Sequence, residues 1–311
     1  MILWNKHILS VMELTTKEIE YIIKLALKLK KKSEPLLKKK VLAMIFQKPS
    51  TRTRMSFEVA MLEMGGHAVN LTMNDLQLSR GETVEDTART LSVYADVIGA
   101  RVYDHNDIVK IANAANVPVI NMLSDIYHPC QVLGDLLTIK ELKKELKGLK
   151  LTWIGDGNNV CNSLIAGCAM MGINVTVACP NGYQPYREAV DFAKEKAVQN
   201  KCIFEITSDP KQAVKNADIV YTDAFVSMGN ETEKNARLEA FLPGYQVNKE
   251  LMKLSKHNAI FMHCLPAKRG VEVTDDVIDG KQSVVWQEAE NRLHAQKALL
   301  CLMLVENIKD L

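Results

Sequence analysis

The sequence is poor in aromatic residues and carries almost no net charge. Aromatic side chains make up 6% of its 311 residues, and 39 Lys and Arg residues nearly balance 37 Asp and Glu residues, for a net charge of +2. Nucleic-acid binding depends on many basic contacts with phosphates, so this balance argues against a nucleic-acid partner. The hydrophobic share of 47% and the charged share of 24% are typical of a globular protein, which excludes a disordered or collagen-like chain.

A long apolar run is also absent. No stretch approaches the roughly 18 to 20 uninterrupted apolar residues of a membrane span. The first residues, Met1 to Lys6, lack the basic start, the apolar run and the small-residue cleavage site of a signal peptide. We therefore expect no membrane partner and a cytoplasmic location.

Paired cysteine motifs are missing as well. The seven cysteines include no C-x-x-C pair, so neither a zinc ribbon nor a thioredoxin motif is indicated. Most of them lie among apolar residues, which is typical of reduced thiols in a protein core.

Short apolar segments alternate with helical patterns in this sequence, and the alternation occurs twice. A capping-box pattern, Thr15-x-x-Glu18, predicts an N-terminal helix. In the first half we expect strands over 41–46, 68–72, 97–102 and 117–122, and helices over 55–64, 84–94, 107–115 and 130–147. In the second half we expect strands over 151–156, 175–179, 203–206, 219–222 and 260–263, and helices over 163–171, 186–198, 211–216 and 287–304.

Strands separated by helices predict parallel sheets with helices on both faces. The expected fold class is α/β, with two doubly wound domains joined by the long helix and by a C-terminal helix that returns to the first domain. The predicted domains are residues 1–140, with 287–311 packing back onto them, and residues 150–286. In such sheets, ligands bind beyond the carboxyl ends of the strands.

A group of hydroxyl and basic residues follows the first predicted strand. The run Ser50-Thr51-Arg52-Thr53-Arg54 lies where that strand ends and the next helix begins. The free N–H groups and the dipole of a helix start favour an anion, and the fork of Arg52 can hold two phosphate oxygens. The run predicts an oxyanion site, although without G-x-x-x-x-G-K it is not a nucleotide P-loop.

Two weaker signals follow other strands of the first domain. His128-Pro129-Cys130-Gln131 stands at the start of the long helix, and Arg101 stands at the end of another strand. A histidine with a glutamine amide could hold a carbamoyl or amide group by both ends. Each signal taken alone is more often structural.

The second domain offers Gly155-Asp156-Gly157 after its first strand and Asp223 after a later one. The G-x-G pattern raises nicotinamide-cofactor binding as an alternative, but the third glycine and the acidic residue about 20 positions further on are missing. Asp223 at a strand end could hold a cationic amine. The polar run 230–235 predicts a mobile surface loop.

The run His263-Cys264-Leu265-Pro266 follows the last predicted strand. A neighbouring histidine and cysteine suggest a metal site or a thiolate nucleophile. Adjacent side chains of an extended chain point in opposite directions, so we expect the two neither to share a metal nor to act as a pair. Cys264 is then a polar residue that lines a site.

Taken together and in this order, these motifs resemble the aspartate/ornithine carbamoyltransferase family. The runs 50–54 and 128–131 resemble its carbamoyl-phosphate motifs. Asp223 with Ser227-Met228-Gly229, and the run 263–266, resemble the motifs of its ornithine branch. The resemblance covers nearly the whole chain.

The resemblance implies transfer of a carbamoyl group from carbamoyl phosphate to the side-chain amine of ornithine, without an organic cofactor or a catalytic metal. The residues implied to bind carbamoyl phosphate are Ser50, Thr51, Arg52, Thr53, Gln77, Arg101, His128, Pro129, Cys130, Gln131, Cys264, Leu265 and Arg292. Those implied to bind ornithine are Asn159, Asp223, Ser227 and Met228, and the catalytic residues are Arg101, His128, Asp223 and Cys264. Gln77 would come from a neighbouring subunit, because the family forms homotrimers or multiples of them.

Some alternatives stay open at this point. A carbamoyltransferase for another amine, such as putrescine, is disfavoured by Asp223 and the Ser-Met-Gly run. A relative without activity is disfavoured by the intact Arg52, His128, Gln131 and Cys264. The motifs do not distinguish synthesis of citrulline from its breakdown. Gly134 inside the long helix is unusual, since it should cost about 1 kcal/mol relative to Ala.

Overall fold

The computed structural model describes residues 3–226 and 231–306. The chain divides into two compact units, of which unit 1 comprises Met1–Leu137 with Glu290–Leu311 and unit 2 comprises Thr138–Ala289. The boundaries between the units fall inside two helices, α5 (Pro129–Lys143) and α12 (Val285–Leu304). The predicted fold class, with two parallel α/β sheets, a connecting helix and a returning C-terminal helix, is confirmed.

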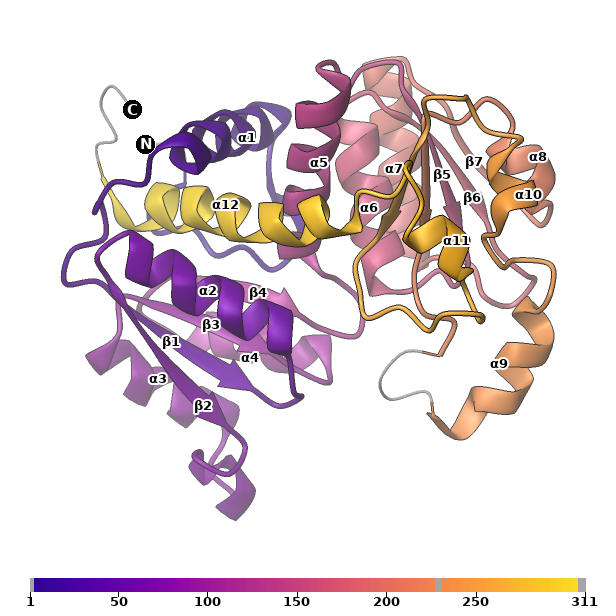
Figure 1. Cartoon of the computed structure of the whole chain (residues 1–311). Coiled ribbons are helices and arrows are strands. Elements are labelled where there is room, and N and C mark those ends of the chain that lie inside the picture. The colour runs from indigo at the N-terminus through magenta and orange to yellow at the C-terminus, as the bar shows by residue number, and fades with distance from the viewer. Residues whose placement is uncertain (1–2, 227–230, 307–311) are drawn as a thin grey trace. The chain divides into compact units, whose positions relative to one another are not determined.

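Unit 1 contains a parallel sheet in the order β2-β1-β3-β4. Its strands are β1 (Val41–Phe46), β2 (His67–Thr72), β3 (Val97–Arg101) and β4 (Val119–Leu123). Figure 1 shows α2 (Thr51–Glu63) on one face of this sheet, and α3 (Val84–Tyr94) and α4 (His105–Ala114) on the other. Strands β1 and β3 lie in the middle of the sheet and are buried almost throughout, as expected for short apolar segments between two layers of helices.

The C-terminal helix α12 packs against the N-terminal helices of unit 1. Lys30, near the end of α1 (Thr16–Lys31), donates to the Asn291 side chain at 2.8 Å. The buried Lys297 pairs with Glu63 at the end of α2. The capping box at the start of α1 is confirmed, since Thr15 accepts from the Glu18 backbone N–H while the Glu18 carboxylate accepts from that of Thr15.

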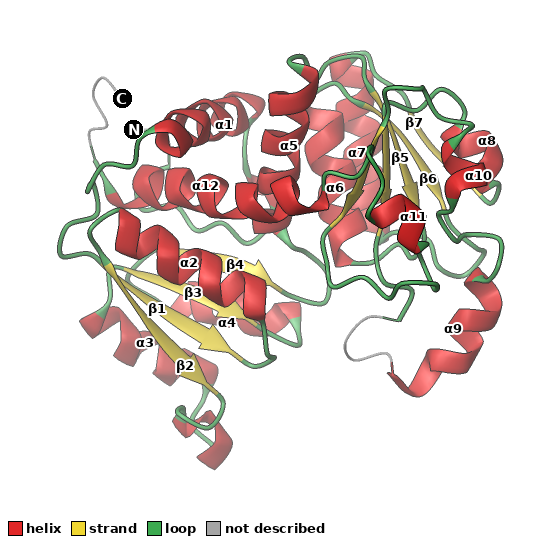
Figure 2. Ribbon diagram, viewed as in Figure 1, coloured by secondary structure: helices red, strands yellow, loops and turns green. Residues whose placement is uncertain are grey.

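Unit 2 contains a second parallel sheet in the order β7-β6-β5-β8-β9. Its strands are β5 (Lys150–Ile154), β6 (Asn174–Ala178), β7 (Phe204–Thr207), β8 (Ile219–Thr222) and β9 (Ile260–His263). Its longer helices are α6 (Asn159–Met170) and α7 (Arg187–Asn200), and its shorter ones are α8 (Pro210–Val214), α9 (Lys234–Phe241), α10 (Lys249–Met252) and α11 (Asp275–Ile278). Figure 2 shows α6 and α7 on one face of this sheet, with α8 and α10 on the other. Because β5 and β8 are neighbours, the residues that follow these two strands come together.

The expected loop over residues 230–235 is wrong in its described part. Residues Glu231–Glu233 form the short 3-10 helix η3, and Lys234–Phe241 form α9. This segment is charged and buries only Phe241 fully, so its sequence shows no apolar period. Phe241 anchors the helix by stacking on Phe225, with the ring centroids 4.6 Å apart. Among the described residues, no helix is both long and apolar enough to cross a membrane.

Gly157 is required by a close approach of the backbone. A Cβ at this position would lie 2.2 Å from the Pro185 nitrogen and 2.3 Å from the Gln184 carbonyl carbon. The Gly157 N–H donates to the Tyr183 carbonyl at 2.9 Å, which fixes the two loops together. This packing against residues 183–185 accounts for the second glycine of the G-x-G pattern, so the pattern needs no cofactor phosphate to explain it.

We predict that Gly157→Ala lowers the free energy of unfolding by roughly 1–3 kcal/mol, the usual cost of overpacking. Chemical denaturation monitored by circular dichroism measures the change. Gly244→Ala is the matched control, because a Cβ at Gly244 meets nothing within 4 Å. A loss no larger for Gly157→Ala than for the control would show that the two loops are not held in close contact.

Candidate active site

The oxyanion motif lies at the carboxyl end of β1 and at the start of α2. Helix α2 begins at Thr51, four residues before the predicted start at 55, because Ser50 caps it by accepting from the Thr53 N–H at 3.2 Å. The polar residues of this first turn gave no apolar signal, which is why the prediction missed them. Thr51, Arg52 and Thr53 therefore belong to the first helical turn, where N–H groups without helical partners favour an anion.

Arg292 connects three helices of unit 1. From α12, its Nη1 donates to Gln131 Oε1 on α5 at 2.6 Å and its Nη2 donates to Thr53 Oγ1 on α2 at 3.1 Å. Gln131 in turn donates to the Asp135 carboxylate at 2.8 Å. The Arg292 side chain is almost fully buried, and its Nε has no hydrogen-bond partner among the described residues. A buried cation with an unused donor suits an anionic ligand.

His128 is neutral near pH 7. It is buried, and burial together with the charges of Arg292, Arg101 and Arg52 holds its pKa well below the ordinary value of 6.5. A neutral imidazole has one donor and one acceptor nitrogen. The guanidinium groups of Arg52, Arg101 and Arg292 are thus near enough to the uncharged His128 ring to lower its pKa.

The rest of the second motif is structural in its side chains. Pro129 is the first residue of α5, a position where the missing N–H of proline costs nothing. The Cys130 thiol lies 3.5 Å from the Asn121 carbonyl oxygen, and burial raises its pKa to about 12. Cys130 therefore remains a thiol, and its sulfur contacts the backbone of β4.

Gly134 allows α12 to approach α5. A Cβ at this position would lie 3.2 Å from Arg292 Cδ, 3.3 Å from its backbone nitrogen and 3.4 Å from its Cα. The glycine inside the helix, unexplained by the sequence, thus has a packing role. It sets the position from which Arg292 reaches Gln131 and Thr53.

In unit 2, Asp223 directly follows β8 and is buried. Its Oδ2 accepts from Asn158 Nδ2 at 2.7 Å, and its Oδ1 accepts from the Ala224 N–H at 2.7 Å. Asn158 also caps α6, because its Oδ1 accepts from the N–H groups of Val160 and Cys161. The residue expected from the sequence is Asn159, which is the first residue of α6 and is half-buried. The Asn158–Asp223 pair spans 65 residues and is visible only in the fold.

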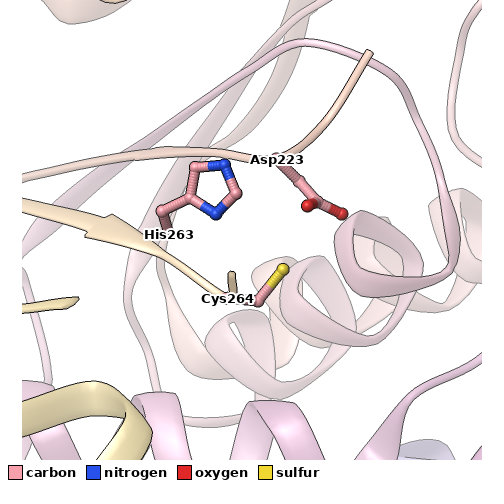
Figure 3. Close-up of side chains that lie close together, drawn as sticks. All are labelled: Asp223, His263 and Cys264. Atoms are coloured by element: carbon pink, nitrogen blue, oxygen red, sulfur yellow. The ribbon is translucent and has the colours of Figure 1, made fainter. Parts of the chain in front are cut away.

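Cys264 lies beside both His263 and Asp223, contrary to the expectation that His263 and Cys264 point apart. The ligand atoms of the three side chains lie within 4.8 Å of one another, and Figure 3 shows the Cys264 sulfur directed toward the Asp223 carboxylate. The prediction was wrong because β9 ends at His263 and the chain then turns, with Leu265 at a φ of 58°. A residue in this left-handed region ends the strand alternation.

The three side chains do not fit a resident metal ion. His263 Nδ1 accepts from the Leu265 N–H at 2.9 Å, so its other nitrogen carries the hydrogen and lies 3.2 Å from Glu272 Oε1. Both ring nitrogens are thus engaged within the protein, and ligation would break one of these bonds. The hydrogen bond from the Leu265 N–H to His263 Nδ1 stabilises the turn that contains Cys264 and Leu265.

Three further predicted site residues are Gln77, Ser227 and Met228. Gln77 is exposed in the short 3-10 helix η2 (Gln77–Arg80), which follows the edge strand β2. Ser227 and Met228 lie outside the described residues.

Comparisons with known proteins agree with this organisation. Residues 6–141 match the carbamoyl-phosphate-binding domain of the aspartate/ornithine carbamoyltransferases, and residues 147–303 match their aspartate/ornithine-binding domain. The chain belongs to the aspartate/ornithine carbamoyltransferase family, and the resemblance inferred from its motifs is confirmed.

Within this family, the similar proteins include several ornithine carbamoyltransferases. The one from Methanosarcina mazei is 54% identical over 301 residues, covering 95% of this chain and 98% of that protein. The anabolic enzyme from Pyrococcus furiosus is 52% identical over 305 residues, covering 96% of each chain. A solved structure of the ornithine carbamoyltransferase from that organism superimposes with a TM-score of 0.95 over 99% of both chains. An acetylornithine transcarbamylase complexed with acetylcitrulline is 32% identical, with a TM-score of 0.87 over 97% of this chain and all of that one.

We predict that Gly134→Ala weakens binding of carbamoyl phosphate and lowers the melting temperature. Alanine is the better helix former by about 1 kcal/mol, but its Cβ must displace the α12 backbone, and overpacking costs roughly 1–3 kcal/mol. Calorimetric titration and differential scanning calorimetry measure the two effects. Leu142→Ala, on an exposed part of the same helix, is the control. Unchanged affinity and a raised melting temperature would mean that Arg292 does not depend on this contact.

Proposed function

We propose that this chain is an ornithine carbamoyltransferase, which transfers the carbamoyl group of carbamoyl phosphate to the side-chain amine of L-ornithine and produces L-citrulline and phosphate. The observation that carries this proposal is the buried Arg292, which donates to Thr53 and Gln131, together with the charges of Arg52 and Arg101 that also act on the neutral His128. Three cations close to one uncharged ring suit a phosphate dianion that must be held beside a carbonyl group. Family membership and the similar proteins support the same activity.

The first step of the proposed mechanism is binding of the phosphate. Ser50, Thr51 and Arg52 present hydroxyl groups, backbone N–H groups and a guanidinium at the start of α2. These donors bind the phosphate group of the substrate and stabilise the negative charge that develops on it as it leaves.

The second step is attack on the carbonyl carbon. As the tetrahedral centre forms, negative charge develops on the carbonyl oxygen, and Arg101, His128 and Thr53 are the donors that stabilise it. Because Thr53 Oγ1 accepts from Arg292, its own hydroxyl hydrogen is directed elsewhere and can be donated to the substrate. Gln131 orients Arg292 through its amide oxygen.

The amine is supplied by ornithine in unit 2. Asp223 binds a positively charged group of the substrate, while Asn159, with Ser227 and Met228, holds the remainder of the amino acid. A free alkylamine has a pKa near 10.4 and must lose its proton before it attacks. Asp223 and Cys264, whose ligand atoms lie within 4.8 Å of each other, line the place proposed for that amine. Alignment of the two reactants supplies much of the rate.

The proposed direction is synthesis of citrulline, because the relatives from Pyrococcus furiosus and Campylobacter jejuni are described as anabolic. The cytoplasmic location stays a prediction from the sequence.

We predict that the protein forms product from ornithine with a kcat/KM roughly 10⁴-fold above that for putrescine, because putrescine lacks the α-carboxylate that Asn159 is proposed to hold. Aspartate should not react, because its second carboxylate would face Asp223. A panel of ornithine, N-acetylornithine, putrescine and aspartate, assayed with carbamoyl phosphate, tests this selectivity. The variant Asp223→Asn should weaken ornithine binding while carbamoyl-phosphate affinity stays nearly unchanged. Equal turnover of putrescine and ornithine by the parent protein would rule out the ornithine branch.

We further propose that the protein is a homotrimer, or a multiple of one, in which Gln77 reaches the phosphate of a neighbouring subunit. Its exposed position beyond the edge strand β2 supports this role. We predict that mixing an inactive Gln77→Ala protein with an inactive Arg52→Ala protein restores activity at about a quarter of the sites, since subunits exchange at random in a cyclic assembly. Mass spectrometry verifies the exchange. Mixed trimers no more active than their parents would show that the sites are not shared.

A further inference from the structure

Two buried carboxylates lie close together in unit 2. Asp156 follows β5 and Asp223 follows β8, and these strands are neighbours whose last residues, Ile154 and Thr222, are paired. Asp156 and Asp223 are each 8% exposed to solvent. Two like charges in one low-dielectric region repel each other, so the arrangement needs a compensating cation.

The two carboxylates differ in their partners. Asp156 Oδ2 accepts from Arg237 Nη1 at 2.8 Å in an ion pair whose side chains are 11% and 12% exposed. Asp223, within the described part of the chain, accepts only from the Asn158 amide and the Ala224 N–H. One carboxylate is therefore neutralised by the protein and the other is bound only by neutral donors.

Arg237 is held in place by several groups besides Asp156. Its Nε donates to the Glu233 carboxylate at 3.0 Å, and its Nη1 lies 3.4 Å from the Phe225 carbonyl oxygen. The guanidinium also lies over the Tyr183 ring, 5.2 Å from its centroid. Its helix α9 is anchored through the stacked Phe241. The Arg237 side chain is therefore fixed by several contacts, unlike the side chains of an exposed surface ion pair.

The electrostatic environment of Asp156 agrees with this geometry. The pKa of Asp156 is raised to about 6, chiefly by burial; Arg237 opposes this rise, and the nearby Asp223 and Glu233 add to it. Arg237 is the only cation among these causes. The negative charge of Asp156 is therefore balanced by the positive charge of Arg237.

We propose that Arg237 determines amine specificity by neutralising Asp156, so that Asp223 is the single uncompensated carboxylate at the amino-acid site. This inference rests on the proposed function. The amino-acid end of ornithine has one ammonium and one carboxylate, which match a site with one free negative charge. A second free carboxylate would repel the substrate carboxylate and attract the second ammonium of a diamine.

The test compares Arg237→Gln with Arg237→Lys, Asp156→Asn and the double variant Asp156→Asn/Arg237→Gln. Steady-state kinetics with ornithine and putrescine give the selectivity as a ratio of kcat/KM values, and titration gives the affinity for carbamoyl phosphate. Glu233→Gln is the control, because it removes a neighbour of Arg237 and leaves the ion pair with Asp156 in place.

Arg237→Gln should raise the KM for ornithine and lower the selectivity for ornithine over putrescine by about tenfold or more, without a change in carbamoyl-phosphate affinity. Arg237→Lys and the uncharged double variant should both recover most of the selectivity. Asp156→Asn leaves a guanidinium without its carboxylate, so it should shift the selectivity in the opposite direction, against the diamine. A merely structural role would not be rescued by removal of both charges.

Unchanged selectivity in Arg237→Gln, or an equal loss in the double variant, would overturn the inference while leaving the proposed function intact. If Arg237→Gln fails to fold, Asp156→Asn still decides, because unchanged or diminished selectivity in that variant contradicts the proposal. A parent protein that forms no citrulline would reject the proposed function and this inference together.

Discussion

The buried guanidinium of Arg292 is the interaction on which the site in unit 1 depends. From α12 it donates to Gln131 on α5 and to Thr53 on α2, at 2.6 and 3.1 Å. These residues lie 161 and 239 positions away in the sequence, so the two hydrogen bonds form only when the C-terminal helix has returned to unit 1. Its close approach requires Gly134, and its charge adds to burial and to the charges of two other arginines in lowering the pKa of His128. The position of Arg292 therefore explains a glycine inside a helix and contributes to the low pKa of a buried histidine.

Unit 2 also contains a parallel sheet, but its polar residues include two neighbouring buried carboxylates. Parallel strands bring several polar residues to one edge, and there two acidic groups would repel each other if both were free. Arg237 compensates Asp156, whereas Asp223 is oriented by the neutral Asn158. Beyond β9, the histidine next to Cys264 holds the turn through its bond to the Leu265 N–H. The cysteine is thereby placed beside Asp223.

The sequence predicted the fold class and much of the order of elements, for a physical reason. Short apolar segments bounded by turn residues have few alternatives, and the bounds predicted for β1, α3, β8 and β9 agree with the structure. Boundaries failed where polar residues begin or make up a helix, as at the start of α2 and throughout α9. The long helix was predicted to residue 147 but ends at Lys143, and Lys144 then adopts a φ of 68°.

Some residues of the candidate site could be predicted from the sequence and others could not. Residues in dense local motifs, such as Arg52 and His128, could be found from the sequence because strand ends and helix starts are local features. Asn158 and Arg237 could not, because their partners lie 65 and 81 residues away and depend on the order of the strands in the sheet. The direction of Cys264 was mistaken because a strand rule was applied one residue beyond the end of the strand.

The most direct test of this account is the pKa of His128, measured by NMR titration of the imidazole in the free protein and in the presence of saturating phosphate. With three arginines around a buried ring, the account predicts a pKa well below 6.5 in the free protein. It also predicts a rise when the dianion binds, since the added negative charge offsets the guanidinium groups. An ordinary pKa that does not respond to phosphate would contradict the claim that these residues form the anion site.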